Sequence, residues 1–275
     1  MPTPVRIAAI SDPHVTKTSL GVLHSLLVQI GESADVLVAC GDLTDYGLAD
    51  EARVLARELS LLRVPVIVVL GNHDYEADQQ DEIRKILTDA GIVVLDGESH
   101  EVLGIGFAGV KGFAGGFGRG VLGSWGEKMV KQFAHEAISE TLKLESALAR
   151  LRTPQRIAIM HYAPIRQTVE GEPLEIYPWL GCSRHEEPFT RYPVTAVFHG
   201  HAHNGTPEGA TASGIPVYNV AMPLLRKRFP DRAPFRVIEV DPSAPSPNGF
   251  GNVTGYTGME RRKEAGVPAA GAGSG

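Results

Sequence analysis

The sequence predicts an α/β fold, a layered α/β/β/α sandwich in which two packed mixed β-sheets are flanked by helices. The first two-thirds of the chain alternate between short runs rich in Val and Ile and stretches with helical spacing of apolar residues. These runs are almost continuously apolar, which is typical of strands in a sheet covered on both faces. Further strand-like runs with mostly short links follow, and they indicate a second sheet packed on the first.

The first sheet is expected from four apolar runs. They are VRIAAI (5–10), DVLVAC (35–40), VPVIVVL (64–70) and GIVVL (91–95). Between them, residues 48–62 and 78–90 place apolar side chains at helical spacing. This alternation predicts strands and helices in turn along this part of the chain.

The second half of the chain is expected to supply the second sheet. Its strand-like runs cover residues 100–110, 156–164, 194–200, 215–222 and 235–241. A long amphipathic helix is predicted at 127–151.

Residues 109–126, GVKGFAGGFGRGVLGSWG, contain eight glycines. No GK[ST] follows them, so the segment does not match a phosphate-binding P-loop. Two interpretations stay open: a flexible loop, or a mobile edge over an active site.

The composition limits the classes of function. The chain has 275 residues and a formal net charge of −6, so broad attraction to nucleic acid or to an anionic membrane is not expected. No stretch approaches the roughly 18 apolar residues of a membrane span, and the N-terminus lacks a signal-peptide pattern. We expect a cytoplasmic protein with a single domain over residues 1–241. A disordered tail rich in Pro, Gly and Ala is expected over 242–275.

Polar residues that suit metal binding follow five of the predicted strands. They occur in SDPH (Asp12, His14), CGDLTD (Asp42, Asp45), GNHD (Asn72, His73, Asp74), MHYAP (His161) and HGHAH (His201, His203). In α/β sheets, sites gather just beyond the carboxyl ends of strands. One such residue is more often a turn or helix-cap residue. Five strand ends of this kind, in order, favour a metal site.

This ordered set resembles the calcineurin-like metallophosphoesterases, whose motifs are D-x-H, G-D-x-x-D, G-N-H-[DE], a lone His and G-H-x-H. Here they read DPH, GDLTD, GNHD, MHYAP and GHAH, and no ligand position is substituted. The resemblance covers residues 5 to about 222. It implies two divalent or trivalent transition-metal ions about 3.5–4 Å apart, with a bridging water that becomes a hydroxide nucleophile.

The resemblance also assigns the ligands. Asp12, His14, Asp42 and His203 would hold the first metal, and Asp42, Asn72, His161 and His201 the second. Asp42 would bridge the two ions, since a carboxylate has two oxygens. Imidazole mixed with hard oxygen ligands suits Mn, Fe, Zn, Ni or Co, and the sequence does not select among them.

The remaining polar residues of GDLTD and GNHD receive other roles. In the family the His73 position faces the substrate, as a proton donor to the leaving oxygen or as a hydrogen bond to phosphate. Asp45 would orient His73 through its other ring nitrogen. We expect Asp74 to be structural.

The stretch HGHAH places three histidines at alternate positions, which in a regular strand would lie on one face. For His201 and His203 to serve different ions, the chain must leave strand geometry, which we expect at Gly200 because glycine tolerates unusual dihedrals. We expect His199 to pack behind the site.

Two weaker candidates for contact with substrate lie near the motifs. Arg184 is in a loop between the last two ligand segments, where it would bind phosphate or pair with Glu186 or Glu187. Tyr162 follows His161 and would reach the same pocket.

The predicted function is metal-dependent hydrolysis of a small phosphorylated substrate, either a phosphodiester or a phosphomonoester. One alternative is a non-catalytic scaffold of the same fold, and another is a nuclease acting on nucleic-acid phosphodiesters. The oligomeric state, the substrate and the preference between mono- and diesters stay open.

Overall fold

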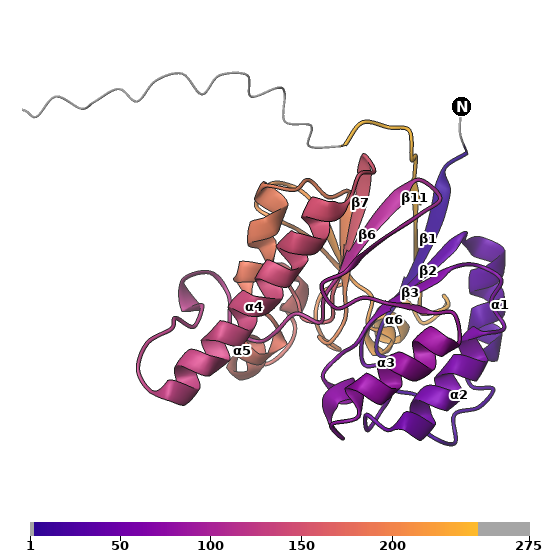
Figure 1. Cartoon of the computed structure of the whole chain (residues 1–275), viewed down its shortest axis with the longest axis horizontal. Coiled ribbons are helices and arrows are strands. Elements are labelled where there is room, and N and C mark those ends of the chain that lie inside the picture. Colours follow the sequence, from indigo (N-terminus) through magenta and orange to yellow (C-terminus); the bar gives the residue numbers. More distant parts are fainter. Residues whose placement is uncertain (1–2, 247–275) are drawn as a thin grey trace, which may run out of the picture.

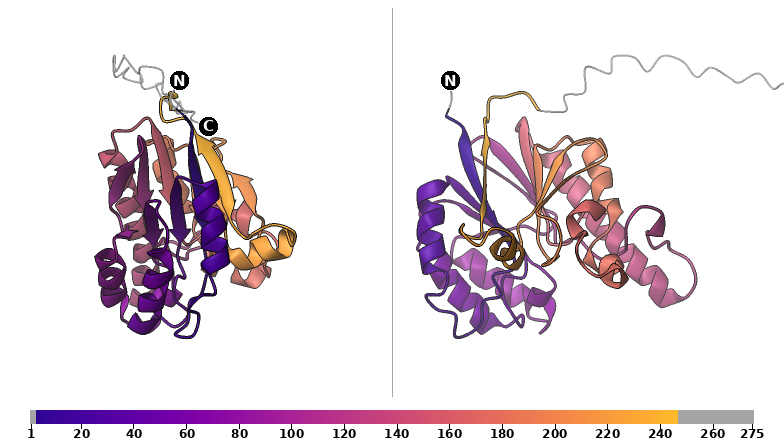
Figure 2. Two further views of the ribbon diagram at one scale, coloured as in Figure 1. Left: turned by 90° about the vertical axis from the view of Figure 1, so that its right-hand side faces the viewer. Right: turned by 180° about the vertical axis from the view of Figure 1, so that it is seen from behind.

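The computed structural model describes residues 3–246. In it, two β-sheets face each other, with α1, α2 and α3 on one outer side and α4 on the other (Figure 1). The predicted α/β/β/α sandwich is confirmed. Figure 2 shows the structure from the side of α1 to α3 and from behind.

The first sheet has the strand order β11-β1-β2-β3-β4. β1 to β4 are parallel, and β11 pairs antiparallel with β1. The strands are β1 (Val5–Ile10), β2 (Val36–Cys40), β3 (Val66–Val69), β4 (Val93–Val94) and β11 (Arg236–Val240).

The second sheet has the order β5-β6-β7-β8-β10-β9, with antiparallel edge strands. Its four central strands, β6, β7, β8 and β10, are parallel. The strands are β5 (Ser99–Val102), β6 (Ile105–Gly109), β7 (Gln155–Ile159), β8 (Ala196–His199), β9 (Glu208–Ala210) and β10 (Pro216–Asn219).

Helices cover the outer face of each sheet. The α-helices are α1 (His24–Ser33), α2 (Ala49–Leu59), α3 (Gln80–Asp89), α4 (Lys128–Arg150), α5 (Tyr177–Leu180) and α6 (Met222–Arg228). Short 3-10 helices lie at η1 (His73–Tyr75), η2 (Gly118–Gly120), η3 (Arg166–Val169), η4 (Leu174–Ile176) and η5 (Ser183–Thr190).

Both faces of β1 are buried, which explains its continuous apolar sequence. Ile7 and Ala9 pack between the sheets, whereas Ala8 and Ile10 pack against α1 and α2. A third apolar cluster, which includes Leu144 and Leu148, fills the space between α4 and the second sheet. The parallel strands therefore sit in a rigid support, and their carboxyl ends meet at one edge.

Two predictions about strands were wrong. The expected strand 100–110 is a hairpin, because Leu103 (φ 52°) and Gly104 (φ 77°) form a two-residue turn that reverses the chain. The run 235–241 joins the first sheet beside β1 rather than the second. Its pattern shows a strand but not its partner.

Of the predicted tail, 242–275, the structure describes only residues 242–246. Gln155 Nε2 donates hydrogen bonds to the carbonyls of Ala244 and Pro245, at 2.8 and 3.1 Å. The rest of the predicted tail, 247–275, lies outside the described residues. Among residues 3–246, no helix has the length and apolar character needed to cross a bilayer.

Candidate metal centre

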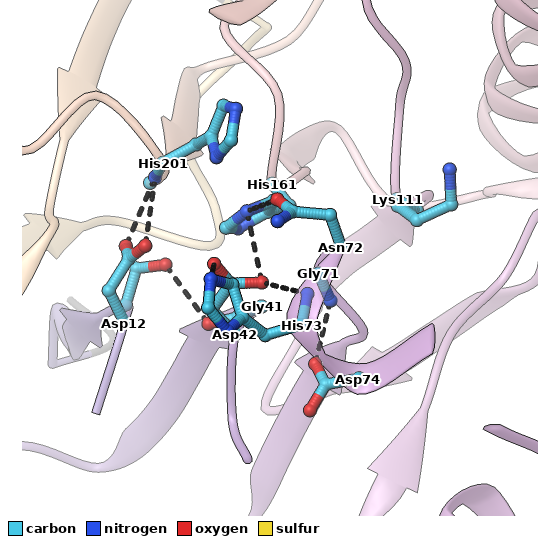
Figure 3. Close-up of polar contacts among 12 residues, drawn as sticks. Asp12, Gly41, Asp42, Gly71, Asn72, His73, Asp74, Lys111, His161 and His201 are labelled. Atoms are coloured by element: carbon cyan, nitrogen blue, oxygen red, sulfur yellow. Dashed lines mark hydrogen bonds and ion pairs between the residues drawn. The ribbon is translucent and has the colours of Figure 1, made fainter. Parts of the chain in front are cut away.

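All seven residues expected as metal ligands lie beyond the carboxyl ends of parallel strands. Asp12 and His14 follow β1, Asp42 follows β2, and Asn72 follows β3. From the second sheet, His161 follows β7, and His201 and His203 follow β8. Figure 3 shows the side chains of both sheets approaching one another.

Four of these residues have a left-handed backbone that non-glycine residues rarely adopt. The φ angles are 57° at Asp12, 45° at His14, 46° at Asp42 and 69° at His201. Each such conformation costs on the order of 1–2 kcal/mol. The surrounding fold imposes this strain at the candidate ligands, which is a pattern typical of functional sites.

The first group of donors is Asp12, His14 and His203. Asp12 is 2% exposed, and its Oδ1 lies 2.9 Å from His203 Nε2. Within residues 3–246, the buried Nε2 atom of His14 has no hydrogen-bond partner. A buried imidazole nitrogen in this position would be satisfied by a metal ion.

The second group is Asp42, His161 and His201, with Asn72 beside it. His161 Nε2 lies 2.9 Å from Asn72 Oδ1 and 3.3 Å from Asp42 Oδ1. Its other nitrogen, Nδ1, donates to the carbonyl of Cys40 at 2.9 Å. Three lone-pair atoms therefore converge, and they repel one another unless a proton or a metal ion lies between them.

The charges of this group agree with that requirement. Burial by itself would lower the pKa of His161, but the Asp42 carboxylate more than offsets it and raises the pKa to about 9. Burial would likewise raise the pKa of Asp42, and its interactions with His161 instead hold that pKa well below its usual range. A cation at this position is therefore stabilised, and a metal ion would replace the proton.

Hydrogen bonds to protein oxygens fix the orientation of several rings. His201 Nε2 donates to the carbonyl of Trp179 at 3.2 Å, so its Nδ1 keeps the free lone pair. The Nδ1 atom of His14 lies 3.2 Å from Asp45 Oδ1, which leaves Nε2 free. Metal-binding histidines usually have their other nitrogen held in this way. The donor set and its supports thus fit transition-metal ions.

The arrangement of Asp45 differs from the expected one. Its carboxylate was expected on His73, but it contacts His14 instead. His73 Nδ1 donates to the main-chain carbonyl of Asp45 at 2.6 Å. His73 Nε2 remains free and lies 4.0 Å from Asp42 Oδ2.

Asp74 forms hydrogen bonds with two of the loops that carry candidate ligands, those after β2 and β3. Its carboxylate accepts hydrogen bonds from the main-chain N–H groups of Gly71, Leu43 and Thr44 and from the Thr44 hydroxyl. Burial, with a contribution from Asp42, raises the pKa of Asp74 to about 6. This contact pattern supports the structural role expected for Asp74.

Glycines before the ligands allow the loops to approach closely. A Cβ at Gly71 would lie 2.2 Å from the main-chain nitrogen of Asp42, and one at Gly200 would lie 2.0 Å from Ser11 Oγ. The left-handed residue after β8 is His201 rather than Gly200, as its φ shows. Gly200 therefore provides clearance, and the change of direction occurs one residue later. His199 is buried, with its Nε2 2.7 Å from Thr168 Oγ1.

The two expected substrate contacts lie in different surroundings. Tyr162 is 8% exposed, and its ring centroid lies 4.7 Å from that of His201. Arg184 Nη1 lies 3.9 Å from Glu187 Oε1, and within the described part of the chain Arg184 forms no hydrogen bond or ion pair with a candidate ligand. The contact between Trp179 and His201 could not be predicted from the sequence, because it uses a main-chain carbonyl that every residue type has.

Two buried histidines, His185 and His199, and the half-buried His201 predict that acid destabilises the metal-free protein. Burial lowers the pKa values of His185, His199 and His201 to about 4, against an ordinary value of 6.5. The unfolded chain therefore binds protons between pH 6.5 and 4 that the folded chain does not, which costs about 3 kcal/mol per histidine. The pKa of Asp74 is raised to about 6, so its carboxyl takes up a proton more readily in the folded protein. This offsets the cost of about one of the three histidines.

Denaturant unfolding of chelator-treated protein at pH 6.5, 5.5 and 4.5 measures this effect. The free energy of unfolding should fall as the pH is lowered, and His185→Gln should make this dependence on pH weaker. His135→Gln, at an exposed position on α4, should leave the slope unchanged. A flat or rising profile between these pH values would contradict the prediction.

Comparisons with known proteins give a family match and a solved structure of similar fold. The calcineurin-like phosphoesterase family matches residues 5–205. No curated protein sequence matches the chain significantly. A solved phosphopantetheinyl hydrolase from Mycobacterium tuberculosis has the same fold, with 19% identity and a TM-score of 0.61 over 88% of this chain and 98% of that one. The protein TT1561 from Thermus thermophilus gives 16% identity and a TM-score of 0.49 over 87% of this chain and 100% of that one.

The family match extends over most of the chain and includes all five segments that carry the candidate ligands. The chain therefore belongs to the calcineurin-like phosphoesterase family, a family of metal-dependent hydrolases.

Proposed function

We propose that this protein hydrolyses phosphoesters of a small molecule at a centre that holds two transition-metal ions. The observation that carries the proposal is the convergence of free donor atoms around Asp42. Its Oδ1 lies 3.3 Å from His161 Nε2, and its Oδ2 lies 4.0 Å from the unpartnered Nε2 of His14. One carboxylate thus faces both donor groups, which supports a bridging role.

Each donor group would hold one ion. Asp12, His14, Asp42 and His203 would bind the first, and Asp42, Asn72, His161 and His201 the second. Bound metal ions would supply positive charge for the phosphoryl oxygens and lower the pKa of a bound water, with Mn, Fe, Zn, Ni or Co as suitable elements. The protein contributes the strained loops and the oriented rings that hold the donors before any substrate arrives.

In this proposal, His73 is the residue that moves a proton. The carbonyl of Asp45 accepts from its Nδ1–H, so Nε2 is the atom that would act on the substrate. Nε2 lies 4.0 Å from Asp42 Oδ2, so the ring faces the carboxylate that the two metal ions would share. We assign His73 as the donor to the leaving oxygen, and Asp45 as the residue that positions it through its main chain.

The alternatives have less support. A scaffold that had lost catalysis would not need an unpartnered His14 nitrogen and four strained ligand positions. The net charge of −6 gives no general attraction to nucleic acid, which argues against a nuclease.

The proposal is tested by metal analysis combined with hydrolysis assays. Purified protein loaded with Mn²⁺, Fe²⁺, Zn²⁺, Ni²⁺ or Co²⁺ should bind two ions per chain and hydrolyse p-nitrophenyl phosphate or bis(p-nitrophenyl) phosphate. Removal of the ions with a chelator should abolish turnover, and re-addition should restore it. Two bound ions with no turnover of either substrate would favour the scaffold instead.

A further inference from the structure

Four aromatic side chains form a continuous surface beside the candidate metal centre. We call Phe113, Phe133, Tyr162 and Trp179 the aromatic wall. The ring centroids of Phe113 and Phe133 are 4.9 Å apart, and those of Phe133 and Trp179 are 5.5 Å apart in an edge-to-face arrangement. Phe113 also lies 6.0 Å from Tyr162. These distances are typical of favourable aromatic packing.

The aromatic wall contacts the candidate ligands through the Tyr162 ring and through the main chain of Trp179. The Tyr162 ring lies 4.7 Å from the His201 ring and 5.5 Å from the His161 ring. At the other end, the carbonyl of Trp179 accepts the hydrogen bond from His201 Nε2. The Tyr162 ring thus borders the candidate ligands, and the other rings of the wall continue from it.

Trp179 is exposed although its neighbours are partly buried. The residue is 57% exposed, whereas Tyr162 is 8% exposed and Phe113 and Phe133 are intermediate. Exposed tryptophan surface next to a site is a common feature of surfaces that bind ligands. The exposed indole is the part of the wall that is free to accept a partner.

Main-chain bonds hold this surface in place. Gly115 N–H donates to the carbonyl of Pro178 at 2.8 Å, and Ala163 N–H donates to the carbonyl of Leu180 at 3.0 Å. The segment around Trp179 is thus fixed both to the glycine-rich segment and to the loop after β7. A rigid surface loses little conformational entropy when a ring packs on it.

We propose that the aromatic wall is a leaving-group subsite, which binds phosphoesters whose alcohol part carries a planar aromatic ring. The inference rests on the proposed function, since the metal centre places the phosphate. Ring packing on Trp179 and Phe133 would orient the ester bond toward His73 and would select aromatic over aliphatic alcohols. The expected contribution is about threefold to tenfold, in line with about 0.5–1.5 kcal/mol for one aromatic pair.

Binding tests the proposal without any turnover. Calorimetry on the metal-loaded protein should show tighter binding of benzylphosphonate than of butylphosphonate. Trp179→Ala should reduce this preference about threefold to tenfold, and Trp179→Phe should keep part of it. Trp125→Ala is the matched control, because Trp125 is 67% exposed and, within residues 3–246, its ring does not pack against the aromatic wall.

Hydrolysis of benzyl phosphate and butyl phosphate gives the second measurement. Both are primary alkyl esters, so the ratio of their kcat/KM values measures the effect of the aromatic ring. Trp179→Ala and Phe133→Ala should lower the ratio, and Trp125→Ala should not. An unchanged ratio in Trp179→Ala, or an equal loss for both substrates with loss of metal, overturns the proposal. If the wild type prefers benzylphosphonate but hydrolyses neither ester, the proposed function fails and the subsite stands.

Discussion

Asp42→Asn is expected to abolish metal binding and phosphoester hydrolysis together. Asp42 faces both donor groups, and asparagine would keep the shape while removing the negative charge and one ligand oxygen. The hydrogen bond from the main-chain N–H of His73 to Asp42 Oδ1, 2.9 Å long, could survive in the variant, so the loop should keep its position. Changes in groups that only orient metal ligands already cost about 10–100-fold in affinity or activity, and loss of the ligand itself should exceed that range.

Metal content per chain and kcat/KM for p-nitrophenyl phosphate measure the result. The matched control is Asp231→Asn, an exposed aspartate after α6, which should keep two ions and full activity. Denaturant unfolding of the chelated proteins would show that Asp42→Asn is folded. If this variant retained two ions per chain, the bridging role of Asp42 would be wrong.

The sequence predicted most of the fold because buried parallel strands have a simple signature. β1, β2 and β3 are apolar on both faces, so their runs could be recognised directly. The place of β11 could not be predicted, since its side chains alternate in burial and its partner lies at the other end of the chain. The turn at Leu103 and Gly104 was missed because leucine rarely adopts a positive φ.

The candidate ligands were predicted from residue types and order, whereas their supports were not. Asp, His and Asn after strands are visible in a sequence, and the structure brings all seven together. His73 and His201 contact the main-chain carbonyls of Asp45 and Trp179. Such contacts cannot be predicted from residue type, because every residue has a main-chain carbonyl. The carboxylate of Asp45 supports His14 instead, because the left-handed turn at His14 directs its ring toward that carboxylate.

His73→Ala is expected to retain both metal ions and to lose most of the rate. His73 forms a separate cluster with His14 and Asp45 and belongs to neither of the two donor groups that the metals would occupy, so its removal should leave the metal content unchanged. A positioned general acid contributes about 10²–10⁴-fold. We therefore expect kcat for butyl phosphate to fall by about 100-fold or more, because an alkoxide is a poor leaving group without a proton.

The leaving group separates this role from a purely structural one. p-Nitrophenolate leaves readily without protonation, so the loss for p-nitrophenyl phosphate should be much smaller than for butyl phosphate. The comparison is best made at several pH values, since loss of a general acid also removes its limb from the pH profile. Glu76→Gln is the control, because Glu76 is exposed and its Oε2 lies 3.6 Å from the Nδ1 atom of His73. An equal loss for both esters would mean that His73 binds phosphate rather than donating a proton, and loss of metal would mean that it supports the ligands. Retained metal with a loss that depends on the leaving group would instead assign proton donation to His73.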